Sequence, residues 1–428
     1  MIKKIIVVIT LFVSIVGFSQ KNNTSAYSFF GIGDKNNSST VEQLSMGGIG
    51  VSLNESYHLN FLNPAANASL RFTTYTMAIE NLNNKAKDSN GEQSASATYL
   101  SYLALGFPLG EKGGMTIGLL PNSSVGYSLV SNKYDAGNNL TEVTQYIGDG
   151  GTNKVFVSIG YKPFKNFSIG LQGNYIFGKI ENSILNQVKD ASLATKYQTV
   201  SNIKGLTLNG GFQYKTIINS KLDFLFGGNF DFNNEIEATG TEYLYSVSLG
   251  GISESARDTI LSAESTGFLK SPLKTTLGLG LGRENKWYAG IDYSFQNALE
   301  LSGGVFNNYS KIDYDKYSKI ALGGFYTPKF NSITSYWDRV TYRAGVKFEN
   351  TGLLVDASGN NTDFTAIDDF GISFGVGLPM SKQLSNLNIG FEIGKRGQTA
   401  KGLVQENYVN FRLGLSLNDK WFKKLEIF

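Results

Sequence analysis

The most informative absences in this sequence concern cysteine, histidine and net charge. Cysteine is missing from all 428 residues, which excludes disulfides, thiolate metal sites and a lipid-modified cysteine anchor. Histidine occurs once, as His58, and proline occurs seven times. Lysine and arginine (38) only slightly outnumber aspartate and glutamate (35), and they are dispersed, so nothing indicates a nucleic-acid partner.

Long apolar runs are also missing after the first twenty residues, although a helical transporter needs runs of roughly 20 residues. Charged residues make up only 17% of the chain, whereas aromatic residues reach 13% and glycine contributes 49 residues. Low charge with abundant Gly, Tyr and Phe is typical of strands that alternate a lipid-facing side chain with a small lumen-facing one. A chain of this length can form one large β-barrel.

The first twenty residues have the pattern of an export signal. Lys3 and Lys4 form a basic start, residues 5–16 are apolar, and small residues precede a cleavage point after Ser19. We therefore predict a signal peptide at 1–19 and an exported mature chain. A retained membrane anchor is the alternative for the same stretch.

Most of the remaining chain alternates apolar with small or polar residues. In residues 367–379, for example, Phe370, Ile372 and Phe374 alternate with glycine and serine. A secreted adhesin or sandwich, the rival all-β class, would carry charged residues along its outward face. We predict an all-β fold, a fourteen-stranded antiparallel transmembrane β-barrel in the outer membrane. The expected strands are residues 73–83, 94–109, 113–130, 153–163, 166–180, 203–217, 221–235, 271–283, 286–297, 317–328, 339–350, 367–379, 386–397 and 406–418.

The expected connections alternate in length. Outer-membrane barrels join their strands by short periplasmic turns and longer external loops, and an even strand count places both ends in the periplasm. The long connections here are residues 131–152, 181–202 and 236–270. The last of these has amphipathic helical character from Ser253 to Ala263. We interpret it as a solvated loop, with a partner-docking helix as the alternative.

Residues 20–72 do not have the pattern of strands and precede the barrel. A fourteen-stranded lumen is too wide for its own side chains to fill, so we predict that this segment plugs it as a hatch. Glycine allows tight turns and close approach to the wall, and an Asn-Pro pair favours a capped turn over a regular helix. The expected hatch and gate residues are Gly47, Gly48, Gly50, Asn63, Pro64 and Ala65.

The third expected strand is interrupted by Pro121. Proline removes a ladder donor and belongs at an edge or a bulge, and a closed barrel has no edge. We predict a local gap or bulge in the wall here. The alternative is that the strand ends at Leu120 and the rest is the root of a loop. The residues expected to shape a lateral opening are Gly118, Pro121, Asn122 and Ser123.

Four stretches carry a family resemblance. SMGGIGVSL (45–53) followed by NFLNPAANASL (60–70) resembles the N-terminal signature of the long-chain fatty-acid transporter (FadL-like, OmpP1-type) outer-membrane family. SAYSFFGIGD (25–34) and GLLPNSSVGYS (118–128) are similar to versions found in Bacteroidota members. The resemblance implies a hatch, a fourteen-stranded barrel and a third strand kinked inwards. It also implies passive uptake of hydrophobic, fatty-acid-like molecules through the hatch and a lateral opening.

A second class of function stays open, because FadL-like barrels of Bacteroidota also resemble partners of larger outer-membrane machines. In that case the chain is a non-transporting subunit of a barrel-assembly complex or of type IX secretion. The expected partners are outer-membrane lipid, a hydrophobic ligand and, for the second class, assembly or secretion proteins.

Enzymatic chemistry is not expected. A nucleophile needs a base, and His58 has no visible serine–histidine motif, so we interpret it as a hydrogen-bonding hatch residue. The acidic spacing from Asp356 to Asp363 lacks the downstream glutamate of a calcium loop, so we expect no metal or cofactor. Charges after Leu417 interrupt a lipid-facing strand. The predicted domains are therefore the hatch (20–72), the barrel (73–418) and a periplasmic tail (419–428).

Overall fold

The computed structural model of the protein describes residues 23–89, 91–219, 221–250, 253–306, 312–356, 362–380 and 385–420. The signal peptide predicted at 1–19, most of the calcium-like stretch and residues 421–428 of the predicted tail lie outside these residues. Within the described residues, no helix has the length and apolar character needed to span a membrane.

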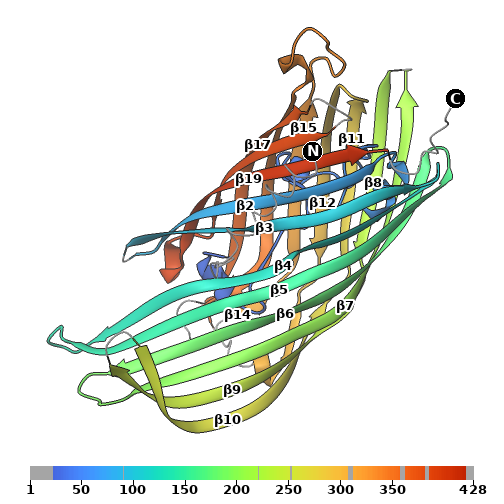
Figure 1. Cartoon of the computed structure of the whole chain (residues 1–428). Coiled ribbons are helices and arrows are strands. Elements are labelled where there is room, and N and C mark those ends of the chain that lie inside the picture. Colours follow the sequence, from blue (N-terminus) through green and yellow to red (C-terminus); the bar gives the residue numbers. More distant parts are fainter. Residues whose placement is uncertain are drawn as a thin grey trace, which may run out of the picture.

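The chain forms one antiparallel sheet that closes on itself (Figure 1). Closure is made by the last strand, β19, which pairs with β2 along fifteen residue pairs from Gln405 opposite Lys87 to Asp419 opposite Thr73. The fourteen-stranded antiparallel fold expected from the sequence is confirmed. Its wall strands are β2 (Thr73–Lys87), β3 (Glu92–Leu109), β4 (Gly113–Tyr134), β5 (Leu140–Phe164), β6 (Phe167–Val188), β7 (Ala194–Ile218), β8 (Leu222–Asp231), β11 (Lys274–Arg283), β12 (Trp287–Gln296), β15 (Tyr317–Tyr326), β16 (Thr341–Val355), β17 (Thr365–Pro379), β18 (Asn386–Arg396) and β19 (Gln405–Asp419).

Several strands run well beyond the expected segments. The supposed loops 131–152 and 181–202 are mostly strand, because β4–β5 and β6–β7 keep pairing almost to their tips. Beyond β8 and β11, β9 (Asn234–Gly250) and β10 (Ser253–Ser271) form a long hairpin. The solvated loop expected at 236–270 and its helical alternative are therefore both wrong. The shorter extensions are β13 (Glu300–Gly303) and β14 (Ile312–Tyr314).

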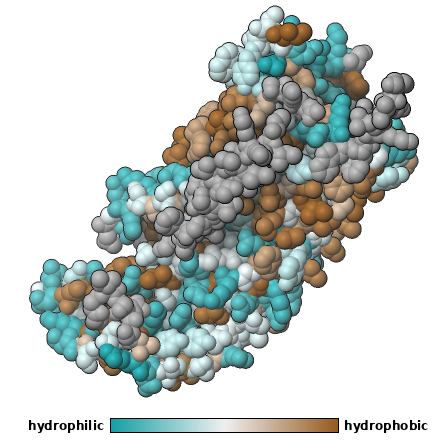
Figure 2. Space-filling model, viewed as in Figure 1, coloured by the Kyte–Doolittle hydropathy of each residue, from teal (hydrophilic) through white to brown (hydrophobic). Residues whose placement is uncertain are grey.

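The alternating pattern divides each strand between two faces. On β17, Phe374 is 53% exposed, whereas the neighbouring Ser373 is only 2% exposed. The apolar side chains on the outer face gather across the middle of the barrel, and hydrophilic residues dominate both ends (Figure 2). An outward apolar band of this kind is what lipid contact requires of a membrane barrel.

Residues 23–72, here called the N-terminal segment, lie inside the barrel. Four buried apolar clusters hold the molecule together, and each combines side chains of this segment with side chains of the wall. The core therefore lies between the segment and the inner face of the sheet. The segment contains η1 (Ala26–Phe29), β1 (Asp34–Lys35), α2 (Val41–Leu44) and η2 (Pro64–Ser69); η3 (Gly304–Phe306), η4 (Trp337–Arg339) and η5 (Ala400–Gly402) lie in wall connections.

Candidate functional site: the filled lumen and the gap beside β4

The strands β3 and β4 separate part-way along the wall. They pair from Leu109 opposite Gly113 to Leu103 opposite Leu119, and no further. Beyond that point β3 stays with β2, and β4 stays with β5, so the two strands diverge (Figure 1). Backbone groups on an open edge must find other partners in a membrane wall.

Pro121 lies just past the last β3–β4 pair. The register between β4 and β5 shifts between Pro121 and Ser123, which is the bulge predicted from the sequence. The alternative, a strand that ends at Leu120, is wrong because β4 continues to Tyr134.

The other residues expected to shape an opening lie beside this bulge. Asn122 and Ser123 both bond through their side chains to the Thr152 hydroxyl on β5, at 3.0 and 2.7 Å. Gly118 lies before the gap, where an added Cβ would come within 2.5 Å of the Phe156 ring. The backbone at the start of the gap is therefore fixed to β5 and not to β3.

The freed edge of β4 is covered by residues 23–36, here called the seal segment. Strand β1 pairs antiparallel with β4, placing Asp34 opposite Ser124 and Lys35 opposite Ser123. Asn36 extends this pairing, since its N–H donates to the Asn122 carbonyl at 3.0 Å. The chain's own N-terminal residues thus take the place that β3 leaves.

Side chains of the seal segment satisfy further groups along β4. The Asn23 amide donates to the Ser124 carbonyl at 2.9 Å. The Ser28 hydroxyl accepts from the Gly126 N–H at 3.2 Å. Because β3 no longer pairs with this side of β4, these bonds replace the ladder bonds that a neighbouring wall strand would supply.

The far side of the seal segment is tied to β18 and β19. The Glu406 carboxylate accepts from the Ser25 hydroxyl at 2.9 Å and from the Ala26 N–H at 2.7 Å. Arg396 forms an ion pair with Asp34 at 2.8 Å. The seal segment therefore spans the lumen side of the gap, from β4 to β18 and β19.

The three predicted hatch glycines lie against the opposite wall. The N–H of Gly47 donates to the Ser373 hydroxyl on β17 at 2.7 Å. Gly47 has a φ of +75°, and an added Cβ would lie 2.9 Å from the Val346 carbonyl, so both backbone shape and space require glycine. The Gly50 N–H donates to the Asp292 carboxylate at 2.8 Å, and Gly48 packs close to the Lys319 ammonium.

Asn63 is bonded in several directions and is fully buried. Its amide donates to the carbonyls of Val51, Phe212 and Gly228 at 2.8, 3.0 and 3.2 Å. Its carbonyl oxygen accepts from the Ala65 N–H at 3.0 Å and so caps η2, which Pro64 begins.

The predicted gate residues and the predicted opening residues are not brought together. Asn63 lies against β7 and β8, and Pro64 and Ala65 lie against Gly170 of β6. The residues at the gap instead contact the seal segment. Sequence reasoning missed this seal, and the available signal was the family resemblance of residues 25–34.

A buried ion network on the lumen wall was also missed. Arg412 lies between Glu80 and Glu392 at 2.7 and 2.6 Å, and Lys347 contacts Glu392 and Asp369 at 2.8 and 3.4 Å. All five residues lie on neighbouring strands, at positions that the apolar–polar alternation assigns to the lumen face. This alternation is the sequence signal that could have located the network. Buried charges persist only when paired and hydrogen-bonded, as these are.

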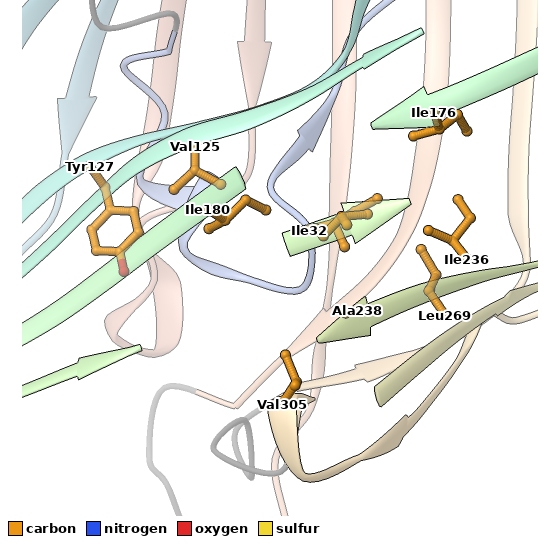
Figure 3. Close-up of a cluster of buried hydrophobic side chains, with 10 residues drawn as sticks. Ile32, Val125, Tyr127, Ile176, Ile180, Ile236, Ala238, Leu269 and Val305 are labelled. Atoms are coloured by element: carbon orange, nitrogen blue, oxygen red, sulfur yellow. The ribbon is translucent and has the colours of Figure 1, made fainter. Parts of the chain in front are cut away.

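A cavity of about 400 Å³ remains between the seal segment and the wall strands. Part of its lining is apolar, where Ile32 packs with Ile176, Ile236 and Leu269 (Figure 3). Other lining residues are charged, and they include Lys35, Lys154 and Lys274. The cavity is therefore lined partly by apolar side chains and partly by charged ones.

His58 lies near the opposite end of the N-terminal segment. Its ring nitrogens contact the Glu55 carboxylate at 2.9 Å and the Asn386 amide at 3.2 Å. The His58 side chain is thus engaged in hydrogen bonds on both sides. Burial raises the pKa of Glu55, but the nearby His58 and Arg343 outweigh it, so that the pKa is lowered overall. Within the described residues, no group of three or more His, Cys, Asp or Glu side chains is arranged to hold a metal ion.

A fourteen-stranded barrel whose lumen holds an N-terminal segment, and whose second and third wall strands diverge, has the FadL-type channel fold. A Pseudomonas aeruginosa FadL homologue aligns with 90% of this chain and 98% of its own, with a TM-score of 0.57 and 13% identity. The toluene transporter TodX of P. putida aligns with 90% of this chain and 99% of its own, with a TM-score of 0.59 and 14% identity. The Ralstonia pickettii toluene transporter TbuX aligns with 90% of this chain and 100% of its own, with a TM-score of 0.56 and 13% identity.

At such low identity, these likenesses establish the fold. The family comes from a separate match, since the model of the BamG family covers residues 1–427. The chain belongs to the BamG family. No curated protein matches it.

Proposed function

We propose that this chain is an outer-membrane barrel that acts as a non-transporting subunit of a barrel-assembly complex. The observation that carries the proposal is the way the N-terminal segment is fastened. It bonds to β4 and β19 at one side and to β7, β8, β12 and β17 at others. An N-terminal segment bonded to six different wall strands is better suited to a permanently fixed hatch than to a gate that opens and closes.

The outer membrane follows from the export signal predicted at 1–19 and from the apolar band on the barrel. Membrane strands alternate lipid-facing and lumen-facing residues as these do. Short turns then lie in the periplasm and the long β4–β7 and β9–β10 extensions lie outside. The BamG family name supports assembly machinery over type IX secretion as the setting.

One periplasmic connection is suited to docking a partner. Most turns at this rim span two or three residues, but residues 327–340 between β15 and β16 form a structured loop that projects from it (Figure 1). Ile333 is 100% exposed and Trp337 is 66% exposed. The loop is folded on itself, since Ser332 bonds to Asp338 at 3.2 Å. Exposed Trp and Tyr side chains on an ordered loop are typical of binding hot spots.

Native purification in mild detergent tests the proposal. Mass spectrometry of the purified material should find assembly-machinery proteins in fixed stoichiometry and no transported lipid in the lumen. A chain that purifies alone with lipid bound inside the barrel would contradict the subunit role.

The gap beside β4 favours a second candidate, passive uptake of hydrophobic molecules with a lateral exit. In this case a ligand enters from outside, passes the N-terminal segment and leaves between β3 and β4 once the seal segment moves. The membrane is a downhill sink for apolar surface, at roughly 25 cal/mol per Å². Pro121, Asn122 and Ser123 would frame the exit, and Asn63, Pro64 and Ala65 would belong to the hatch it passes.

A disulfide staple separates this candidate from the first. The chain has no cysteine, so Lys35→Cys with Ser123→Cys would join the seal segment to β4 without competing thiols. If uptake uses the gap, oxidation should abolish entry of a hydrophobic dye and reduction should restore it. The matched control is Lys87→Cys with Gln405→Cys, a cross-strand pair away from the gap. Uptake that is indifferent to the first staple would exclude the lateral route.

A further inference from the structure

Three lysines from distant parts of the chain converge on the lumen cavity. Lys35 comes from β1, Lys154 from β5 and Lys274 from β11, and all three line the same space of about 400 Å³. None is paired with a carboxylate in the described part of the chain. Lys154 donates to the Ser38 hydroxyl at 2.8 Å, and the Lys274 ammonium lies 4.5 Å from the centre of the Tyr317 ring.

One carboxylate, Asp231, acts on both Lys35 and Lys154. It lies directly opposite Lys274 in the β8–β11 register. Its Oδ1 accepts from the side-chain amides of both Asn209 and Asn229, and no described ammonium group lies within ion-pair distance of the carboxylate. Glu349, which also lines the cavity, acts on Lys35 and Lys274 as well, so three cations face two anions here.

The remaining charges that line the cavity are balanced elsewhere. Arg396 pairs with Asp34, and Lys347 pairs with Asp369. Lys319 lies opposite Glu349 in the β15–β16 register and close to Asp292, which accepts backbone N–H groups of the N-terminal segment. Asp315 is exposed at the mouth. Six cationic and six anionic side chains line the cavity in all, so the positive character is local to the place where Lys35, Lys154 and Lys274 meet.

A further donor lies beside these lysines. The side-chain nitrogen of Asn36, a cavity-lining residue, is buried and has no acceptor. The Lys35 ammonium likewise has no carboxylate within ion-pair distance in the described residues, although it lies on the same cavity as Lys274. An ammonium group and an amide N–H of this kind are donors that an anion can accept from.

We propose that Lys35, Lys154, Lys274 and the Asn36 amide bind a phosphate group inside the barrel. Three ammonium groups and one amide supply donors for the three or four oxygens of a phosphate, whereas a carboxylate offers only two oxygens. A cavity of this size is in the range of small-ligand sites, and ammonium groups are common phosphate ligands. The phosphate can be free or can belong to a lipid headgroup, and the inference does not depend on the proposed role.

Calorimetric titration of the purified full chain tests the site with three probes: inorganic phosphate, short-chain phosphatidate and hexanoate. We expect one of the phosphates, or both, to bind more tightly than hexanoate. Phosphate alone points to the free ion, and phosphatidate alone points to a lipid headgroup. Lys274→Met and Lys35→Met should each weaken binding roughly tenfold or more, because a charge-assisted bond is lost.

Two controls keep the test decisive. Lys286→Met removes an exposed lysine at the rim turn, outside the cavity lining, and should leave binding unchanged. Lys274→Arg keeps the charge and should retain most of the affinity, with heat-dependent gel mobility checking that each variant is folded. The inference is overturned if hexanoate binds as tightly as the phosphates, if none of the probes binds, or if Lys286→Met weakens binding as much as Lys274→Met.

Discussion

Single polar side chains do most of the work of attaching the N-terminal segment to the wall. Asn63 and Asp292 each satisfy two or more backbone groups of other elements. Each such bond contributes about 0.5–1.5 kcal/mol net, but leaving a buried partner unsatisfied costs more. These residues are therefore fastening points whose loss should loosen the segment locally without unfolding the barrel.

Asn63 provides the sharpest test at this scale. Asn63→Ala removes the η2 cap and one donor from each of three carbonyls, of which that of Val51 still accepts from Gln213, so the local opening free energy should fall by roughly 1–3 kcal/mol. Hydrogen exchange of residues 51–66 measures it. Asn63→Asp keeps the acceptor that caps Ala65 but directs a carboxylate at three carbonyl oxygens, so it should exchange faster still. Asn83→Ala on the exposed face of β2 is the control, and wild-type protection in Asn63→Asp would contradict the assignment.

At the scale of elements, the seal segment is the least expected feature. A wall strand normally pairs on both sides, yet β4 beyond Leu119 pairs with β5 on one side and with β1 on the other. The contact is short, with two residues in β1, so its strength depends on the side-chain bonds around it. Short, locally bonded elements are the ones that open first in native proteins.

Gly33 offers a way to detach this element. It has a φ of +88°, and an added Cβ would lie 2.5 Å from the Ser124 carbonyl oxygen. Gly33→Val should therefore separate β1 from β4, with a cost of at least about 1–2 kcal/mol from backbone conformation alone. Hydrogen exchange at residues 31–36 should rise. Gly91→Val, where an added Cβ meets nothing within 4 Å, is the matched control, and equal protection in the two variants would argue against the seal.

The β9–β10 hairpin gives a second test at this scale. The hairpin extends beyond the residue pairs between β8 and β11, which run from Lys274 opposite Asp231 to Gly282 opposite Asp223. Replacing residues 240–265 by an Asn-Gly turn should leave the fourteen-stranded wall intact, because no rung of β8 or β11 is removed. Heat-dependent gel mobility and circular dichroism measure this. Loss of the heat-resistant form would show that the extension is needed for closure.

For the whole molecule, the wall strands can be predicted from the sequence better than the contacts inside the lumen. Alternation identified all fourteen wall strands, because lipid on one side and a crowded interior on the other impose a period of two. The pattern is weakest in residues 256–264 of β10, which are exposed along their whole length, and so it predicts a loop or a helix at Ser253–Ala263. The bonds of Ser28 to Gly126 and of Asn63 to Gly228 join residues about a hundred or more positions apart. No local pattern encodes such pairings.

The subunit role makes its last prediction at the loop of residues 327–340. Ile333→Ser with Trp337→Ala removes exposed apolar surface and touches no wall strand, so barrel stability should stay within about 0.5 kcal/mol. If the loop is the docking surface, copurification of the partner should fall roughly tenfold or more, since buried Trp anchors dominate binding energy. Phe164→Ser is the matched control, because Phe164 is 71% exposed at another turn of the same rim. Equal loss in both variants would indicate a general effect of surface polarity, and unchanged copurification in both would place the partner elsewhere on the barrel.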